Sequence, residues 1–327
     1  MDRSSTTVWV FAEIGPEGAQ DPALELLTKA RSLGGEVAAV AFGPGAAAAA
    51  DVLGAHGAST LFAGEDAVFA DHPSLPAAHA VAALAREHSP DLILFPTTYG
   101  GRDVAGRTQA LLGCTLMSNA TDVLAPDRAR TEFAGGARIV DVELDGSGPR
   151  LVLVRPRSFP PEPLDGAGPA TVVPVDAGDL PAHATGPTIV EHHEESSAGP
   201  ELGGAKVVIA GGRGLGGPDA FALLDELAGE IGGAAVGASR AAVDAGWVPY
   251  RYQIGQTGIT VTPEVYLAFG ISGALQHVVG MKKAKRIVAV NKDADAPIMA
   301  MADVAVVGDL FQIVPALIEE IRRRGSA

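Results

Sequence analysis

A glycine-rich turn is the first feature of the sequence whose residue types and spacing could do chemistry. Gly212, Gly214 and Gly217 have the spacing G-x-G-x-x-G, between an apolar stretch at residues 206–210 and a segment opened by Pro218. Glycines in such a turn let backbone N–H groups and a helix N-terminus approach the pyrophosphate of a dinucleotide. A sharp strand-to-helix turn without a ligand has the same spacing, so the motif alone leaves both interpretations open.

The residues after the turn disfavour an NAD site. Such a site has an acidic residue about 20 positions further on, which holds the ribose hydroxyls, whereas residues 231–243 contain no Asp or Glu. Ser239 and Arg240 lie there instead. The sequence therefore favours an NADP phosphate site or a flavin site.

A series of motifs then makes the site more specific. The motifs occupy residues 236–246, 253–258, 270–277, 290–293 and 309–310. In this order they resemble the FAD domain of the electron-transfer flavoprotein α subunit, and the resemblance is strong over residues 206–315. In the first part of the chain it rests on residues 101–103, Arg107, residues 133–137 and residues 155–159, which look like that family's nucleotide-free N-terminal domain.

The resemblance implies that FAD is the cofactor and that no metal is bound. The matching cofactor-binding positions are Arg213, Ser239, Arg240, Ile254, Gly255, Gln256, Thr257, Ser272, Gly273, Ala274, Leu275, Gln276, His277, Asn291, Asp309 and Leu310. In the family the equivalents of Thr257 and His277 lie at flavin N5 and at the pyrimidine edge, and the equivalent of Arg240 lies close to the ring. We expect these three residues to tune the redox potential, and no residue to catalyse a reaction of a substrate.

The chemistry of a one-electron carrier agrees with this site. An anionic semiquinone concentrates its charge near N1 and the C2 carbonyl, so cations and hydrogen-bond donors should converge there. Arg240, His277 and a helix N-terminus after Ser272 could supply them. The sequence therefore predicts a pocket of positive potential. One departure from the family is Ile259, where many relatives carry a lysine, and it removes a cation near the flavin loop.

The same residues also have simpler interpretations. His277 lies in an apolar stretch and could be a hydrogen-bonded core histidine, and Arg240 could be a solvated residue at a helix start. Residues 237–241 superficially resemble a nucleophile elbow, but the last glycine is absent. His192 and His193 could bind a metal, although linker histidines are usually solvated. The alternative functions are an NADP-dependent oxidoreductase and a non-redox protein that binds adenine nucleotide.

Alternating apolar strands and helices must position the site. We expect strands at residues 8–12, 37–42, 92–95, 151–154, 206–210, 286–290 and 304–307, and helices at residues 22–33 and 310–324. This alternation predicts an α/β fold with two domains, each with a mainly parallel sheet, and a Rossmann-like FAD-binding fold in the second. The expected bounds are an N-terminal domain at 1–190, a polar linker at 191–204 and the FAD domain at 205–327.

Composition restricts the partners and the compartment. Lys and Arg number 24 against 39 Asp and Glu, and the net charge of -15 opposes binding to nucleic acid. Cys114 is the single cysteine, which excludes an internal disulfide, and its apolar surroundings predict burial. We expect a cytoplasmic protein without a signal peptide or membrane insertion.

The resemblance also implies partners. It predicts a heterodimer in which a β subunit docks on the N-terminal domain. The expected donors are flavin dehydrogenases such as the acyl-CoA dehydrogenases of fatty acid β-oxidation, and the expected acceptor is a quinone-linked oxidoreductase.

Overall fold

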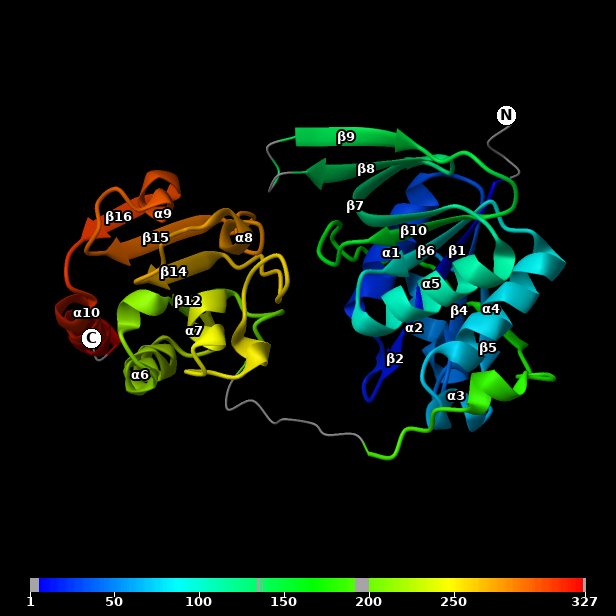
Figure 1. The fold of residues 1–327 in the computed structure, drawn as a ribbon, viewed down its shortest axis with the longest axis horizontal. Coiled ribbons are helices and arrows are strands. Elements are labelled where there is room, and N and C mark those ends of the chain that lie inside the picture. Colours follow the sequence, from blue (N-terminus) through cyan, green and yellow to red (C-terminus); the bar gives the residue numbers. More distant parts are fainter. Residues whose placement is uncertain (1–5, 134–135, 137, 192–199, 326–327) are drawn as a thin grey trace. The chain divides into compact units, whose positions relative to one another are not determined.

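The chain divides into two compact units, Met1–His193 and Glu194–Ala327. The computed structural model describes residues 6–133, 136, 138–191 and 200–325. Most of the predicted linker, including His192 and His193, lies outside the described residues. Figure 1 labels the helices and strands of each unit.

The N-terminal unit is built on a nine-stranded sheet with the order β11-β5-β4-β1-β6-β10-β7-β8-β9. Its strands, including a separate β2-β3 pair, are β1 (Thr7–Ala12), β2 (Ile14–Gly15), β3 (Gly18–Ala19), β4 (Glu36–Phe42), β5 (Thr60–Gly64), β6 (Leu92–Pro96), β7 (Leu116–Ala125), β8 (Arg128–Phe133), β9 (Arg138–Glu143), β10 (Arg150–Val154) and β11 (Thr171–Pro174). Its helices are α1 (Asp21–Ser32), α2 (Ala50–Ala55), α3 (Val68–Asp71), α4 (Leu75–His88) and α5 (Tyr99–Leu112). All neighbours in the large sheet pair in parallel except β7-β8 and β8-β9.

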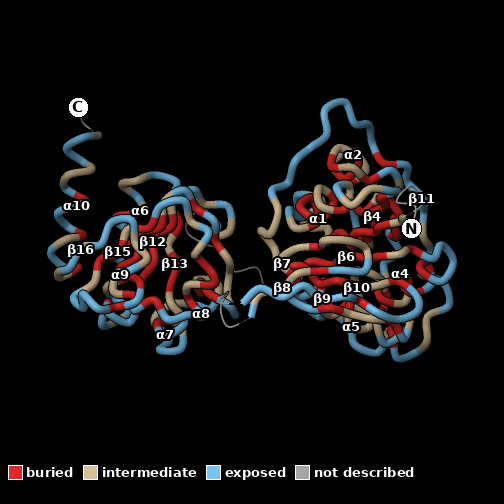
Figure 2. The backbone as a smooth tube through the Cα atoms, turned by 90° about the horizontal axis from the view of Figure 1, so that it is seen from above, coloured by how far each residue is buried: buried red, intermediate tan, exposed pale blue. Residues whose placement is uncertain are grey.

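Burial on both faces explains why the central strands of this sheet are apolar. Helices α1 and α2 pack on one face, and α4 and α5 pack on the other. A parallel strand covered on both sides needs apolar residues at successive positions, as in the buried stretch from Val8 to Ala12. Figure 2 shows the buried residues gathered on these strands, whereas β9 is exposed along most of its length.

The C-terminal unit contains a five-stranded sheet with the order β13-β12-β14-β15-β16, in which every pair is parallel. Its strands are β12 (Val207–Gly211), β13 (Ala234–Ala238), β14 (Val265–Phe269), β15 (Arg286–Asn291) and β16 (Val304–Val307). Its helices are α6 (Phe221–Ile231), α7 (Arg240–Asp244), α8 (Leu275–Val278), α9 (Pro297–Met301) and α10 (Leu310–Gly325). Helices α6 and α10 cover one face together, and the other face is covered by loops and α9 (Figure 1).

The α/β prediction with two mainly parallel sheets is confirmed. The order of the second sheet corresponds to 2-1-3-4-5, the second common doubly wound order, and differs from the 3-2-1-4-5-6 order of the classical dinucleotide fold. Cys114 is buried as predicted, and burial raises the pKa of its thiol. Across the described residues, no helix has both the length and the apolar character needed to span a membrane.

Candidate functional site

A cavity of about 650 Å³ lies at the carboxyl ends of the strands in the C-terminal unit. From β12 the chain runs to β13, which lies on one side of β12 in the sheet, and it then returns to β14, which lies on the other side of β12. The loops after β12 and β14 therefore diverge. Ligands of doubly wound proteins bind in the crevice at this kind of switch point. The topology therefore provides a binding groove where the glycine turn follows β12.

The groove brings together most of the residues predicted to bind the cofactor. Its wall includes Arg213, Ser239, Arg240, Ile254, Gly255, Gln256, Thr257, Ser272, Ala274, Gln276, His277 and Asn291. These residues follow β12, β13, β14 and β15 and come from positions almost 80 residues apart in the chain (213 to 291). The fold thus brings residues from separate sequence motifs together in one groove wall.

Four predicted residues do not line the groove: Gly273, Leu275, Asp309 and Leu310. A Cβ atom on Gly273 would lie 2.4 Å from the backbone nitrogen of Ile298, so this glycine serves the packing against α9. Leu275 is exposed, and Leu310 lies in the apolar core beneath α6 and α10. Asp309 accepts from the backbone N–H of Phe311 at 3.0 Å and pairs with Lys292 at 3.2 Å, so its carboxylate is held at the start of α10.

The groove wall also contains residues that were not predicted from the sequence. They are Gly214, Ala241, Asp244, Gln253, Gly270, Ile271, Asp293 and Ala296. Six of them belong to the matched segments and could have been predicted from these: Ala241, Asp244, Gln253, Gly270, Ile271 and Asp293. Asp244 had a further signal, because it follows Arg240 by four positions and such a pair meets on a helix surface.

The glycine turn has a different role from the one that its spacing suggests. A Cβ atom on Gly212 would lie 2.3 Å from the Gly270 carbonyl oxygen, and one on Gly214 would lie 2.7 Å from the Gly270 Cα. The N–H groups of Gly212 and Gly214 donate to the carbonyls of Phe269 and Gly270, both at 2.9 Å. These glycines allow the first residues of the loops after β12 and β14 to approach each other closely, and their N–H groups are used within the protein.

The expected helix N-terminus at this turn is also absent from the groove. The 3₁₀ turns Arg213–Leu215 and Pro218–Ala220 follow the glycines, and α6 begins only at Phe221. No residue of α6 lines the groove. Of the two interpretations that the motif left open, the structure therefore favours a sharp turn over one in which glycine N–H groups and a helix start hold a pyrophosphate.

Ser239 gives the most specific sign that the groove is built for a ligand. Its backbone N–H donates to the Gly211 carbonyl at 2.9 Å, which fixes the residue after β13. Its Oγ atom is buried and has no hydrogen-bond partner within the described part of the protein. Buried hydroxyls are normally paired, so an unpaired one in a groove wall fits a missing polar ligand.

Arg240 is one of four charged residues in the lining of the groove. Its Nε atom lies 3.2 Å from Asp244 Oδ2, and the side chain is 65% exposed. Arg213 also lines the wall, and so does Asp293. The two arginines and two aspartates have formal charges that cancel, so any positive potential depends on the position of Arg240 rather than on an excess of cations.

The loop at residues 253–258 is fastened to the neighbouring segment by short contacts. The Gln256 N–H donates to the Gln276 carbonyl at 2.7 Å, and a Cβ atom on Gly280 would lie 2.4 Å from the backbone nitrogen of Gly255. Gln253 Nε2 donates to Thr257 Oγ1 at 2.9 Å. Thr257, which was predicted to lie at flavin N5, is therefore held in a fixed position in the wall.

His277 lines the groove as predicted, but it does not supply a positive charge. Burial lowers the pKa of its imidazole from 6.5 to about 4. Both ring nitrogens are used within the protein, Nε2 at 2.8 Å from the Tyr266 hydroxyl and Nδ1 at 3.1 Å from the Ile254 carbonyl. The prediction of a cationic His277 is corrected, because a buried ring without a charged partner stays neutral near pH 7.

Asn291 holds the groove together from the end of β15. Its Nδ2 atom donates to the Ile271 carbonyl at 2.9 Å, and its Oδ1 atom accepts from the Asp293 N–H at 3.0 Å. The side chain thus ties the loop after β14 to the loop after β15. In this structure its amide fixes the groove wall.

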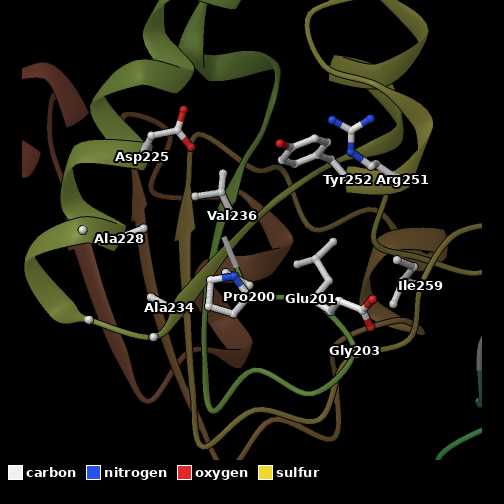
Figure 3. Close-up of a pocket in the computed structure, with 15 residues that line it drawn as sticks. Pro200, Glu201, Gly203, Asp225, Ala228, Ala234, Val236, Arg251, Tyr252 and Ile259 are labelled. Carbon is white, nitrogen blue, oxygen red and sulfur yellow. The ribbon is translucent and has the colours of Figure 1, made fainter. Parts of the chain in front are cut away.

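A second cavity of about 790 Å³ lies beside the edge strand β13 (Figure 3). In Figure 3 Asp225 projects from α6, and Arg251 and Tyr252 come from the opposite wall. None of the residues predicted to bind the cofactor lines this cavity, but Ile259 does. The family departure at Ile259 thus lies in the wall of this cavity and outside the lining of the groove.

Two further alternatives were a metal site and a nucleophile elbow. Where residues are described, no group of three or more His, Cys, Asp or Glu is placed to hold a metal ion, and His192 and His193 lie outside that part. Ser239 has no hydrogen bond to a histidine, as a nucleophile elbow would require, since its hydroxyl has no partner in the described structure.

Comparison with known proteins gives consistent matches. The family model described as the electron transfer flavoprotein domain matches residues 8–180, and the one described as the electron transfer flavoprotein FAD-binding domain matches residues 201–282. The chain is 40% identical over 304 residues to electron transfer flavoprotein subunit alpha of Mycobacterium leprae, covering 92% of this chain and 93% of that protein. It is 39% identical over 319 residues to the subunit alpha of Syntrophomonas wolfei, covering 96% and 99%.

One plant relative and one solved structure complete the comparison. The mitochondrial subunit alpha of Arabidopsis thaliana is 41% identical over 233 residues, covering 70% of this chain and 64% of that protein. A solved structure of the glycotransferase of kitacinnamycin covers 97% of this chain and 93% of that chain at 16% identity. Its TM-score of 0.27 is too low to carry any argument about the fold.

Proposed function

Because this chain belongs to the electron transfer flavoprotein subunit alpha family, we propose that it holds FAD in the groove of its C-terminal unit and carries electrons between partner proteins. FAD is the cofactor of the domain that matches residues 201–282. Family membership also implies a partner β subunit, since the relatives are named as subunit alpha.

The observation that carries the proposal is the unpaired Ser239 hydroxyl in a groove at the switch point of a parallel sheet. Polar groups in such a groove fix the orientation of a cofactor. A volume of about 650 Å³ falls within the range of roughly 300–1,000 Å³ that is usual for cofactor sites. The residues present therefore fit FAD.

The wall residues have distinct roles in the proposed site. Ser239 would bind a polar group of the cofactor, and Arg213 and Arg240 would attract its negative charges. Thr257, fixed by Gln253, would face the ring with the backbone of the 253–258 loop. When bound, FAD would supply the redox chemistry by taking up one electron at a time, with negative charge gathering at N1 and the C2 carbonyl.

The proposal extends to the reaction partners. Flavin dehydrogenases such as acyl-CoA dehydrogenases would donate electrons, and a quinone-linked oxidoreductase would accept them. The β subunit would dock on the N-terminal unit. The chain would act as a carrier without substrate chemistry of its own, since the groove wall presents no nucleophile paired with a general base.

The test is the visible absorption spectrum of the chain co-expressed with its β subunit. We expect flavin bands and one FAD bound to the 201–282 domain. A colourless complex, or one that turns over reduced nicotinamide without flavin, would contradict the proposal and favour the NADP alternative.

Ser239→Ala tests the observation that carries the proposal. Loss of a hydrogen bond to a charged group costs about 1.5–3 kcal/mol, so we expect FAD affinity to fall by on the order of tenfold or more. Ser158→Ala is a matched control, because Ser158 Oγ is also buried without a described partner but lies in the N-terminal unit. Equal effects of the two substitutions on FAD affinity would contradict the assignment of Ser239.

A further inference from the structure

Tyr266 lies behind the groove, on the central part of the C-terminal sheet. It belongs to β14, which pairs with β12 and β15, and its side chain is fully buried at 0% exposure. It does not line the groove itself. Its hydroxyl lies 2.8 Å from Nε2 of His277, which does line the groove.

The two partners of His277 determine which ring nitrogen carries the proton. The Ile254 carbonyl at 3.1 Å from Nδ1 can only accept, so Nδ1 carries hydrogen and donates. In the neutral ring Nε2 is then an acceptor, and the Tyr266 hydroxyl donates to it. The hydrogen bonds run in one direction, from Tyr266 through the His277 ring to the Ile254 carbonyl.

This chain of hydrogen bonds joins three segments of the C-terminal unit. Tyr266 is on β14, His277 is on α8, and Ile254 belongs to the 253–258 loop. The Gln256–Gln276 hydrogen bond of 2.7 Å lies next to it and holds the same loop to the same segment. The central strand is thus connected to the loop that holds Thr257.

We propose that Tyr266 is a positioning residue of the flavin site, whose hydroxyl donates to Nε2 of His277, holds the neutral ring in place in the groove wall and opposes its protonation. This inference rests on the proposed function. It assigns to one hydroxyl group the hydrogen bond at Nε2 that adds to the effect of burial. It also explains why a tyrosine lies at a fully buried position where phenylalanine would fill the same volume.

The surroundings of His277 agree with this role. The causes of its lowered pKa are burial, which favours the neutral form, and the Ile254 carbonyl, which opposes it. Burial raises the pKa of the Tyr266 hydroxyl well above 10, so the phenol keeps its proton and remains a donor. The charged residues in the same groove wall are Arg213, Arg240, Asp244 and Asp293.

The experiment is ¹⁵N NMR of histidine-labelled heterodimer with bound FAD, comparing wild type with Tyr266→Phe. His277→Gln assigns the His277 signals among the 8 histidines. We expect a neutral Nδ1–H ring in wild type. In Tyr266→Phe, Nε2 loses its donor while Nδ1–H still donates to the Ile254 carbonyl, so we expect the doubly protonated ring to appear at a higher pH than in wild type. The midpoint potential of the flavin should rise near pH 6, because a protonated ring favours the reduced, negatively charged flavin.

Tyr252→Phe is the matched control, since Tyr252 lines the second cavity and has no contact with His277 among the described hydrogen bonds. It should leave both readouts unchanged. If the protonation of His277 with pH, or the flavin potential, is unchanged in Tyr266→Phe, the inference is overturned, provided that FAD is bound. Absence of FAD from the wild-type heterodimer would instead contradict the proposed function.

A second variant keeps the test valid if Tyr266→Phe does not fold. Replacing the 4 tyrosines by 3-fluorotyrosine keeps their shape and makes each phenol a stronger donor. The His277 Nε2 resonance should then move, since its donor has changed. An Nε2 resonance that does not move would overturn the inference.

Discussion

Arg240 and His277 differ in how far burial allows each of them to carry charge. The Arg240 side chain is 65% exposed and pairs with Asp244 at 3.2 Å. The His277 ring is only 6% exposed, and its pKa of about 4 leaves it neutral. In the proposed site, electrostatic attraction for a reduced flavin would therefore come from the arginines, whereas His277 would contribute fixed geometry.

Arg240→Gln should lower the midpoint potential of the flavin. One hydrogen bond to a charged group contributes about 1.5–3 kcal/mol, and because Arg240 is largely exposed we expect the lower end, a shift of about 60 mV for one electron. Spectroelectrochemical titration would measure it. The control is Arg286→Gln, since Arg286 is similarly exposed at 72% but lies at the opposite end of β15. A shift of the midpoint potential of the same size in Arg286→Gln would show that the effect of an arginine on the potential does not depend on its position.

Acid should destabilise the C-terminal unit through His277. Its pKa is about 4 in the folded chain and 6.5 when solvated, so the unfolded chain binds more protons between these values. The free energy of unfolding should therefore decrease as pH falls from about 6.5 to about 4, by roughly 3 kcal/mol in total. Urea unfolding of the FAD-free chain at several pH values would measure this slope. His277→Gln should reduce it and the exposed His183→Gln should not; equal slopes in all three proteins would contradict the account.

The glycine turn after β12 acts at the scale of whole elements, because it lets the loops after β12 and β14 approach each other closely. A Cβ atom at Gly214 would meet the Gly270 backbone at 2.7 Å, whereas one at Gly217 would meet nothing within 4 Å. Gly214→Ala should therefore reduce the free energy of unfolding by about 1–3 kcal/mol and weaken FAD binding, while Gly217→Ala should stay within about 0.5 kcal/mol. Thermal unfolding and FAD titration of both variants would measure this.

The opposite ranking of these two variants would support the fingerprint interpretation. In that interpretation the third glycine of the motif is needed for close packing of helix and strand. Gly217 has a φ of 178°, which is extended backbone that other residues adopt. A severe defect in Gly217→Ala with a mild one in Gly214→Ala would contradict the role of Gly214 in the close approach of the two loops.

Elements with a clear apolar pattern were predictable from the sequence, and the short strand β16 was one of them. The strand at residues 304–307 is observed with the same bounds, and helix α10 differs from its prediction by one residue. From the sequence, the groove wall was predictable only as separate motifs. Contacts such as that of Gly214 with Gly270 join residues 56 positions apart (270 minus 214), and they form only in the folded chain. For His277 the sequence left a cationic residue and a hydrogen-bonded core histidine both open, and the burial that makes the ring neutral arises only in the folded chain.

Each unit of the whole molecule has its own apolar core. The two clusters of the first unit and the two clusters of the second contain no residue in common, and each pair sandwiches its own sheet. FAD should therefore stabilise the C-terminal unit selectively, because a ligand stabilises only the part of the chain that folds with it. Hydrogen exchange with and without FAD should show added protection at residues 253–258 and 272–280. Equal protection of β1 and β6 would contradict independent cores.

The location of FAD tests the central claim most directly. A crystal structure of the FAD-bound heterodimer should show the cofactor in the groove of about 650 Å³, with Ser239 Oγ hydrogen-bonded to it and Thr257 facing the ring. Cofactor density in the cavity beside β13 or in the N-terminal unit, with the Ser239 hydroxyl still unpaired, would contradict the account.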